Sequence, residues 1–161
     1  MQAMEAALQL VKKNANAGRF AGPRNLELVT AAESALAVQF PPTYRRFLLE
    51  LGAGDIAGEE FYGIIGPNFD HGRVPNGIWL TLNERRNGLP KPLVIVSSSG
   101  DGIWYAVDTS VADASGESPV VALPLPQSAP KQIASDFGDF FLSTISKALA
   151  VDASGHCSKA R

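Results

Sequence analysis

The sequence predicts an α+β fold, with a mostly antiparallel central sheet and helices packed mainly on one face. Helical periodicity fills residues 1–51 and returns near residue 135, whereas short β-branched and aromatic runs fill the middle of the chain. Hairpin-type turns join the middle runs, and Asp101–Gly102 is the strongest such signal. Hairpins join antiparallel strands, and this separation of helices from strands is typical of the α+β class.

Size and composition predict one globular domain. The chain has 161 residues, of which 45% are hydrophobic and 19% charged, and this is ordinary for a protein with a buried core. A formal net charge of −2 excludes a global field that would recruit nucleic acid or an acidic membrane. We expect a single domain over residues 1–150 and a flexible C-terminal tail over residues 151–161.

The sequence contains no recognisable targeting signal, and this favours a soluble, cytoplasmic protein. The first residues, MQAMEAALQLVKKNA, contain no basic leader before a sustained apolar run. No window approaches the ~18 apolar residues that a membrane span requires. The single cysteine, Cys157, cannot form an internal disulfide, which fits a reducing compartment. Export by a route without a cleaved leader stays open.

The first half of the chain predicts three helices. The first has a buried stripe of Met4, Ala7, Leu8 and Val11, and a loop over residues 18–25 follows it. Thr30 and Glu33 have the spacing of a capping box, which predicts a helix over residues 31–38. That helix would bury Ala32, Ala35 and Leu36.

The third helix follows the pair Pro41–Pro42, because proline is tolerated in a first helical turn. Its buried stripe has the spacing i, i+3, i+4, i+7 and consists of Tyr44, Phe47, Leu48 and Leu51. The charged residues beside the stripe, Arg45, Arg46 and Glu50, are expected to meet solvent.

The second half predicts four strands and two helices. The strands are expected over residues 61–65, 93–96, 103–108 and 120–123. One helix is expected over residues 78–86, with Ile78, Trp79 and Leu82 inward, and the closing helix carries a stripe from Phe137 to Ala148. The proline-rich residues 124–131 are expected to form a connector. Alternation along residues 103–108 places Trp104 and Tyr105 on opposite faces of the sheet.

The stretch GAGDIA matches G-x-G-x-x-A, one form of the dinucleotide-binding loop, through Gly52, Gly54 and Ala57. That loop needs a strand before it and a helix after it, so that helix N–H groups face the phosphates. Here a helix precedes Gly52, and the carboxylates of Glu59 and Glu60 that follow would repel a phosphate. We therefore interpret Gly52 as a left-handed glycine that ends the helix, with a flexible lead into the strand at residue 61.

Other chemical motifs are weak. Ser97–Gly100 lacks the glycines of a nucleophile elbow, and the adjacent His156 and Cys157 stand at no recognised metal spacing. No calcium-loop spacing links the acids Asp101, Asp108, Asp113 and Glu117. We expect no catalytic residue, no cofactor and no metal. A small hydrolase that uses the loop carboxylates is the alternative from another class.

Several segments, in their order along the chain, resemble the SUKH superfamily, which includes bacterial immunity proteins and yeast cell-wall-synthesis regulators. The first segment is TAAESALAVQFPPTYRRFLLELGAGDI. Its positions that take the places of the family pattern are Glu33, Leu36, Phe40, Pro41, Tyr44, Phe47, Leu48 and Gly52. SSSGDGIWYAVD, GESPVVAL and SDFGDFFLSTI are similar to the family's hairpin, following strand and closing helix. The resemblance covers roughly residues 26–149.

The resemblance implies a SUKH-like domain without catalytic residues, whose bacterial members mostly neutralise toxins by binding them in the cytoplasm. The expected partner is a protein, a cognate toxin of the nuclease or deaminase type, and neither nucleic acid nor a membrane. A regulatory protein-interaction scaffold is the alternative among binding proteins.

The residues themselves favour acidic loops as the binding face, since many toxin nucleases are basic and acidic loops would speed their capture. An aromatic side chain beside such acids is a common anchor for protein partners. The candidate contact residues are Asp55, Glu59, Glu60, Asp70, Asp101, Trp104, Asp108, Asp113 and Glu117.

Overall fold

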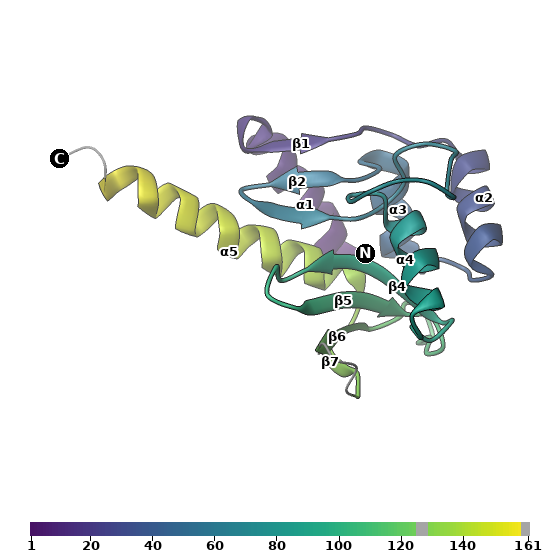
Figure 1. Cartoon of the computed structure of the whole chain (residues 1–161). Helices are drawn as coiled ribbons and strands as arrows, with labels where there is room; N and C mark the ends of the chain where they lie inside the picture. The colour runs from purple at the N-terminus through teal and green to yellow at the C-terminus, as the bar shows by residue number, and fades with distance from the viewer. Residues whose placement is uncertain (125–128, 159–161) are drawn as a thin grey trace.

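The computed structural model describes residues 1–124 and 129–158, with the side chains of residues 156–158 left aside. Its helices are α1 (Gln2–Lys13), α2 (Leu26–Leu36), α3 (Pro42–Glu50), α4 (Gly77–Arg86) and α5 (Phe137–Ser158), and a 3₁₀ turn, η1, covers Ala15–Ala17. Its strands are β1 (Gly18–Phe20), β2 (Gly54–Ile56), β3 (Glu59–Phe61), β4 (Leu93–Ser98), β5 (Ile103–Asp108), β6 (Val120–Pro124) and β7 (Lys131–Ala134). Figure 1 shows their arrangement.

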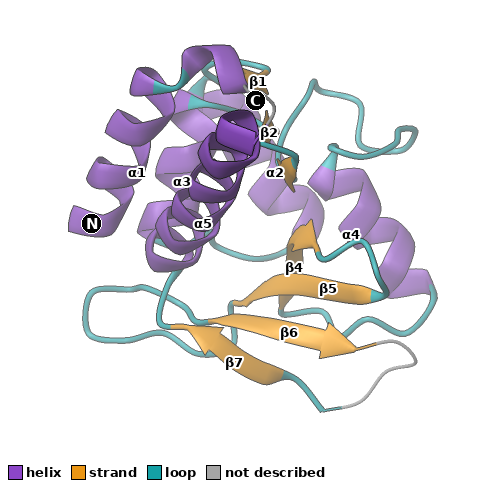
Figure 2. Ribbon diagram, turned by 90° about the vertical axis from the view of Figure 1, so that its left-hand side faces the viewer, coloured by secondary structure: helices purple, strands orange, loops and turns teal. Residues whose placement is uncertain are grey.

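The strands form one antiparallel sheet in which each strand pairs with the next along the chain, from β1 to β7. Helices α1, α3 and α5 pack on one face, whereas α4 packs on the other face, against β4 (Figure 2). We call these the α5 face and the α4 face. The strand β4 is buried from Leu93 to Ser97, as its continuous apolar run predicts. The α+β fold class is confirmed.

Aromatic side chains fill the core on the α5 face. Phe61 of β3 meets Phe141 of α5 with ring centroids 4.7 Å apart, and Tyr44 of α3 meets Phe137 at 5.0 Å. Such edge-on ring pairs add to the free energy already gained by burying the side chains. A smaller cluster on the α4 face joins Leu80 of α4 to Ile95 and its neighbours.

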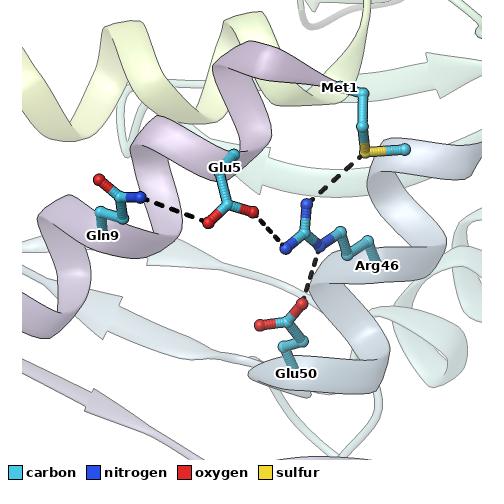
Figure 3. Close-up of polar contacts among 5 residues, drawn as sticks. All are labelled: Met1, Glu5, Gln9, Arg46 and Glu50. Carbon is cyan, nitrogen blue, oxygen red and sulfur yellow. Dashed lines mark hydrogen bonds and ion pairs between the residues drawn. The ribbon is translucent and has the colours of Figure 1, made fainter.

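Arg46 joins α1 to α3 (Figure 3). Its guanidinium contacts Glu5 of α1 at 2.5 Å and Glu50 of α3 at 2.8 Å, and it donates to the sulfur of Met1 at 3.7 Å. Arg46 and Glu50, which were expected to meet solvent, do so only in part. Both are half-buried, because the N-terminal helix packs beside them.

The start of α2 differs from the capping-box expectation. Asn25 is the N-cap, and its side chain accepts a hydrogen bond from the Leu28 backbone N–H at 2.8 Å. Thr30 is consequently in the middle of the helix, and Ala35 is exposed. Glu33 instead turns inward to the chain that follows the helix, where it accepts from the Phe40 backbone N–H at 2.8 Å.

Three short strands, β1, β2 and β7, were not predicted from the sequence pattern. The β1 strand lies in the expected loop and β2 lies in the expected flexible lead, whereas β7 begins at the last residue of the expected connector and fills residues for which no element was expected. They have three or four residues each, too few to show alternation, and pairing with a neighbour decides them. The strand expected over residues 61–65 is shifted to Glu59–Phe61. The first part of the connector, residues 125–128, lies outside the described residues.

The two later helices also need correction in detail. On α4 the buried residues are Gly77, Ile78, Leu80 and Thr81, while Trp79 and Leu82 are half-buried. Thr81 turns inward because its hydroxyl accepts from the Ile95 backbone N–H of β4 at 3.0 Å. Helix α5 continues to Ser158 and projects beyond the sheet, so helix replaces tail over residues 151–158 (Figure 1). Residues 159–161 lie outside the described part of the chain.

Candidate partner-binding face

Four side chains on the α4 face make up the candidate site: Asp55 of β2, Glu60 of β3, Tyr62 after β3 and Trp104 of β5. We call them the acidic–aromatic row. Strand alternation explains their common orientation, because Phe61 and Tyr105 contact phenylalanines of α5 on the opposite face. The expectation that Trp104 and Tyr105 lie on opposite faces is confirmed.

The strand register brings the row together. Asp55 lies directly opposite Glu60 in the β2–β3 hairpin, so the two side chains share one face. Trp104 pairs with Ser98 in the β4–β5 hairpin. The rings of Tyr62 and Trp104 meet edge to face, with centroids 6.5 Å apart.

The backbone that holds Glu60 and Tyr62 is fixed from the core. The Tyr44 hydroxyl donates to the Tyr62 carbonyl at 3.0 Å, and the Ser97 hydroxyl donates to the Glu60 carbonyl at 2.7 Å. The Tyr62 N–H donates to the Val96 carbonyl at 2.8 Å. The row is therefore presented on a rigid element, as a binding surface requires.

Two polar atoms of the row have no internal partner. Within the described residues, Oε1 of Glu60 and Nε1 of Trp104 are buried and form no hydrogen bond. Among the described residues the ion pairs engage Arg45 and Arg46, and none includes Asp55 or Glu60. A buried polar atom without a partner carries an energetic cost that a bound partner can remove.

The surroundings of the row disfavour the ionised forms of Glu60 and Tyr62, because they raise the pKa of both side chains. Burial, and then the nearby charge of Asp55, raise the pKa of Glu60 above its ordinary value. Burial and the Glu60 carboxylate raise the pKa of Tyr62, while the Ser98 side chain lowers it. An external cation near Asp55 and Glu60 would stabilise the ionised carboxylates.

The structure places the other candidate residues elsewhere. Glu59 lies on the α5 face, in a groove of about 820 Å³ between β3, β7 and the outer part of α5. Asp101 accepts a hydrogen bond from the Ser99 hydroxyl within the β4–β5 turn. Asp70 is exposed in the loop before α4. None of the three is part of the row.

The remaining acids lie at the end of β5 that is opposite to Asp101, or in the loop that follows that end. Asp108 accepts from the Ser110 N–H at 3.0 Å, and Asp113 accepts from the Glu117 N–H at 3.0 Å, so both carboxylates order their own loop. Glu117 is 6% exposed and belongs to the interior, which corrects its expected place in a solvated loop. Its carboxylate binds Thr43 of α3.

The row contains one residue that sequence reasoning missed. Tyr62 follows Glu60 by two positions and therefore lies on the same face of the extended chain. The strand was expected to start at Phe61, so Glu60 fell outside it and the shared face of the two residues could not be inferred. The spacing of Glu60 and Tyr62 was the available signal.

The described residues do not assemble the groups that metal chemistry or a membrane span would need. No three side chains of His, Cys, Asp and Glu come together in this part of the chain to hold a metal ion. None of the helices described combines the length and the apolar composition needed to cross a bilayer. The loop carboxylates of the hydrolase alternative are divided, because Asp101 and Asp108 lie at opposite ends of β5.

Comparison with known proteins identifies the family. A search of curated proteins finds no match to the chain. The family model SUKH_6, described as "SMI1-KNR4 cell-wall", matches residues 26–141. This range runs from the start of α2 into the first turn of α5 and includes the whole acidic–aromatic row. Since the match covers more than half of the chain, the protein belongs to the SMI1-KNR4 family of the SUKH superfamily.

Proposed function

We propose that this chain is a non-catalytic immunity protein, which neutralises a cognate bacterial toxin by binding it in a stoichiometric complex. The observation that carries the proposal is the acidic–aromatic row, in which two carboxylates that form no ion pair among the described residues lie beside an aromatic side chain. Membership of a generally non-catalytic family supports a binding role over an enzymatic one. The proposed partner is a toxin of the nuclease or deaminase type, met in the cytoplasm.

The proposed inhibition has two steps: the acidic surface attracts the toxin, and the bound protein then covers the toxin's substrate-binding surface. A toxin that acts on nucleic acid carries a basic surface, because phosphate contacts require Lys and Arg. An acidic surface raises the association rate with such a partner, and aromatic residues contribute affinity once water is excluded. Covering the toxin's substrate-binding surface requires no reaction.

A co-expression experiment tests the proposal. The toxin domain encoded beside this gene is expressed in bacteria with and without the protein, and viability is measured. We expect the protein to restore growth and to elute with the toxin as a complex of fixed stoichiometry in size-exclusion chromatography with light scattering. Equal killing with and without the protein would contradict the proposal for that toxin.

The cell-wall description of the matching family favours a second candidate, a regulatory protein-interaction scaffold of the cell-wall kind. A scaffold would bind a partner without protecting cells from a toxin. Failure to protect against every toxin domain encoded near the gene would favour the scaffold.

A further inference from the structure

The acidic–aromatic row lies on a part of the α4 face that no helix covers. Helix α4 packs over Ile95 and Ala106 through Leu80, further from the β2–β3 and β4–β5 turns. Figure 1 shows α4 in front of one end of the strands, while the end at these turns has no helix before it. Asp55, Glu60 and Trp104 are each half-buried, so their side chains remain accessible from this side.

Two carboxylates of this open face, those of Asp55 and Glu60, form no ion pair within the described residues. Like charges directly opposite each other destabilise an antiparallel pair, and Asp55 and Glu60 are such a pair. Arg19 is the cross-strand neighbour of Asp55 and so lies on the same face, but among the described residues it forms no ion pair with Asp55 or Glu60. Both carboxylates can therefore still accept a cationic group from a partner.

The aromatic half of the row identifies the kind of cation. Arginine has a planar guanidinium that can donate to two carboxylate oxygens at once and can stack on an aromatic face. Lysine carries a compact, strongly hydrated charge that makes no such planar contact. Paired carboxylates beside the half-buried Trp104, whose ring meets the buried Tyr62, therefore fit arginine better than lysine.

We propose that the acidic–aromatic row is the docking surface for an arginine side chain of the protein partner, held by Asp55 and Glu60 and packed against Trp104. The partner is the toxin of the proposed function, so the inference rests on that proposal. The occupant is a protein segment that presents arginine.

The direct test is a titration of the full chain with the capped tripeptide acetyl-Gly-Arg-Gly-amide at low ionic strength. The chain has two tryptophans, Trp79 and Trp104, whose indole N–H signals are observed separately by ¹⁵N NMR and assigned with Trp104→Phe. We expect the Trp104 signal to shift to saturation and the Trp79 signal to stay in place. The same peptide with lysine or glutamine should give a weaker shift or none. Equal responses of both indoles, or of all three peptides, would overturn the inference.

Charge-neutralising variants locate the binding groups. Glu60→Gln and Asp55→Asn should each weaken the peptide by roughly ten-fold or more, since each removes a charge-assisted contact. Asp70→Asn makes the same charge change in the exposed loop before α4 and should leave the titration unchanged. An equal loss in all three variants would indicate a general charge effect and contradict the inference.

The toxin assay separates this inference from the proposed function. If the native chain protects cells and Glu60→Gln and Trp104→Ala protect and bind equally well, the row is not the docking surface, while the immunity function stands. If the native chain does not protect, the immunity function fails, and the peptide titration still decides whether the row binds arginine.

Discussion

The buried carboxylate of Glu117 accepts hydrogen bonds from the backbone N–H of Thr43 at 3.0 Å and from its hydroxyl at 2.9 Å. The Thr43 hydroxyl in turn accepts from the Gly138 N–H at 3.2 Å. One side chain of the β5–β6 loop therefore accepts the hydrogen bonds of two donors in the first turn of α3. Through the Thr43 hydroxyl it is also linked to the start of α5.

Replacing this carboxylate should destabilise the fold. Glu117→Ala leaves the Thr43 N–H and hydroxyl without their partner in the interior, and we expect a loss of about 1–3 kcal/mol in the free energy of unfolding. Glu117→Gln keeps one acceptor and should cost less. Urea unfolding of both variants measures the difference, and equal losses would show that the hydrogen bonds are not responsible.

The glycine that follows α3 should be hard to replace. Gly52 has φ +75°, which confirms its expected left-handed conformation, and a Cβ there would lie 2.6 Å from the Gly22 carbonyl oxygen. Gly52→Ala should cost at least about 2 kcal/mol, from backbone strain and steric overlap together. Gly58→Ala is the matched control, because Gly58 has φ +84° with open space around it. A Gly58→Ala loss as large as that of Gly52→Ala would remove the steric part of this explanation.

Neutralising Glu60 should stabilise the protein in a manner that depends on pH. Burial and Asp55 raise the pKa of Glu60 in the folded state above its ordinary value of 4.5. The folded state then binds the proton more tightly than the unfolded state, so the native chain loses stability as the pH rises from 4.5 through the raised value. Glu60→Gln lacks this loss and should gain up to about 1 kcal/mol near neutral pH, with the gain vanishing well below pH 4.5.

Asp70→Asn is the control for that pH series, because it makes the same change of net charge in an exposed loop away from the row. A Glu60→Gln advantage that is constant with pH would show that the ionisation of Glu60 is not its source. Increased stability together with weaker partner binding in Glu60→Gln would be typical of a residue kept for function.

The contact of Glu33 with the chain between α2 and α3 should contribute more than its ion pair. Oε1 of Glu33 accepts from the Phe40 N–H at 2.8 Å and meets the Arg45 guanidinium at 2.5 Å. Glu33→Ala removes both contacts and leaves the buried N–H unsatisfied, so we expect a loss of about 1–3 kcal/mol. Arg45→Ala removes a partly exposed pair and should cost less than about 1 kcal/mol. Thermal unfolding compares the variants, and the reverse order would contradict this account.

Local signals explain which parts of the fold are predictable from sequence. Helix α3 is preceded by proline, has a clean apolar stripe and ends before glycine, and each of these signals acts within a few residues. The β4–β5 hairpin is likewise indicated by its Asp-Gly turn. The boundary of α2 was misplaced because Thr30 and Glu33 have the same spacing as Asn25 and Leu28, and only the structure shows which pair caps the helix.

The candidate site was predictable only in part, because it depends on pairing between distant segments. Asp55, Glu60 and Trp104 were nominated from charge and aromatic character, but their common face follows from register. Glu117 could not be distinguished in the sequence from the other acids of its polar loop, because its hydrogen-bond partner Thr43 is 74 positions away. Long-range contacts of this kind leave no periodic signature in the chain.

The order of the strands has a consequence for synthesis of the protein. Each strand pairs with its predecessor, so the sheet can grow in the order in which the ribosome delivers it. The rings of Tyr44, Phe47 and Phe61 nevertheless find their covering rings on α5, in Phe137 and Phe141. A nascent chain that has completed every strand therefore still exposes an aromatic surface, and it remains open to aggregation or chaperone capture until its last helix leaves the exit tunnel.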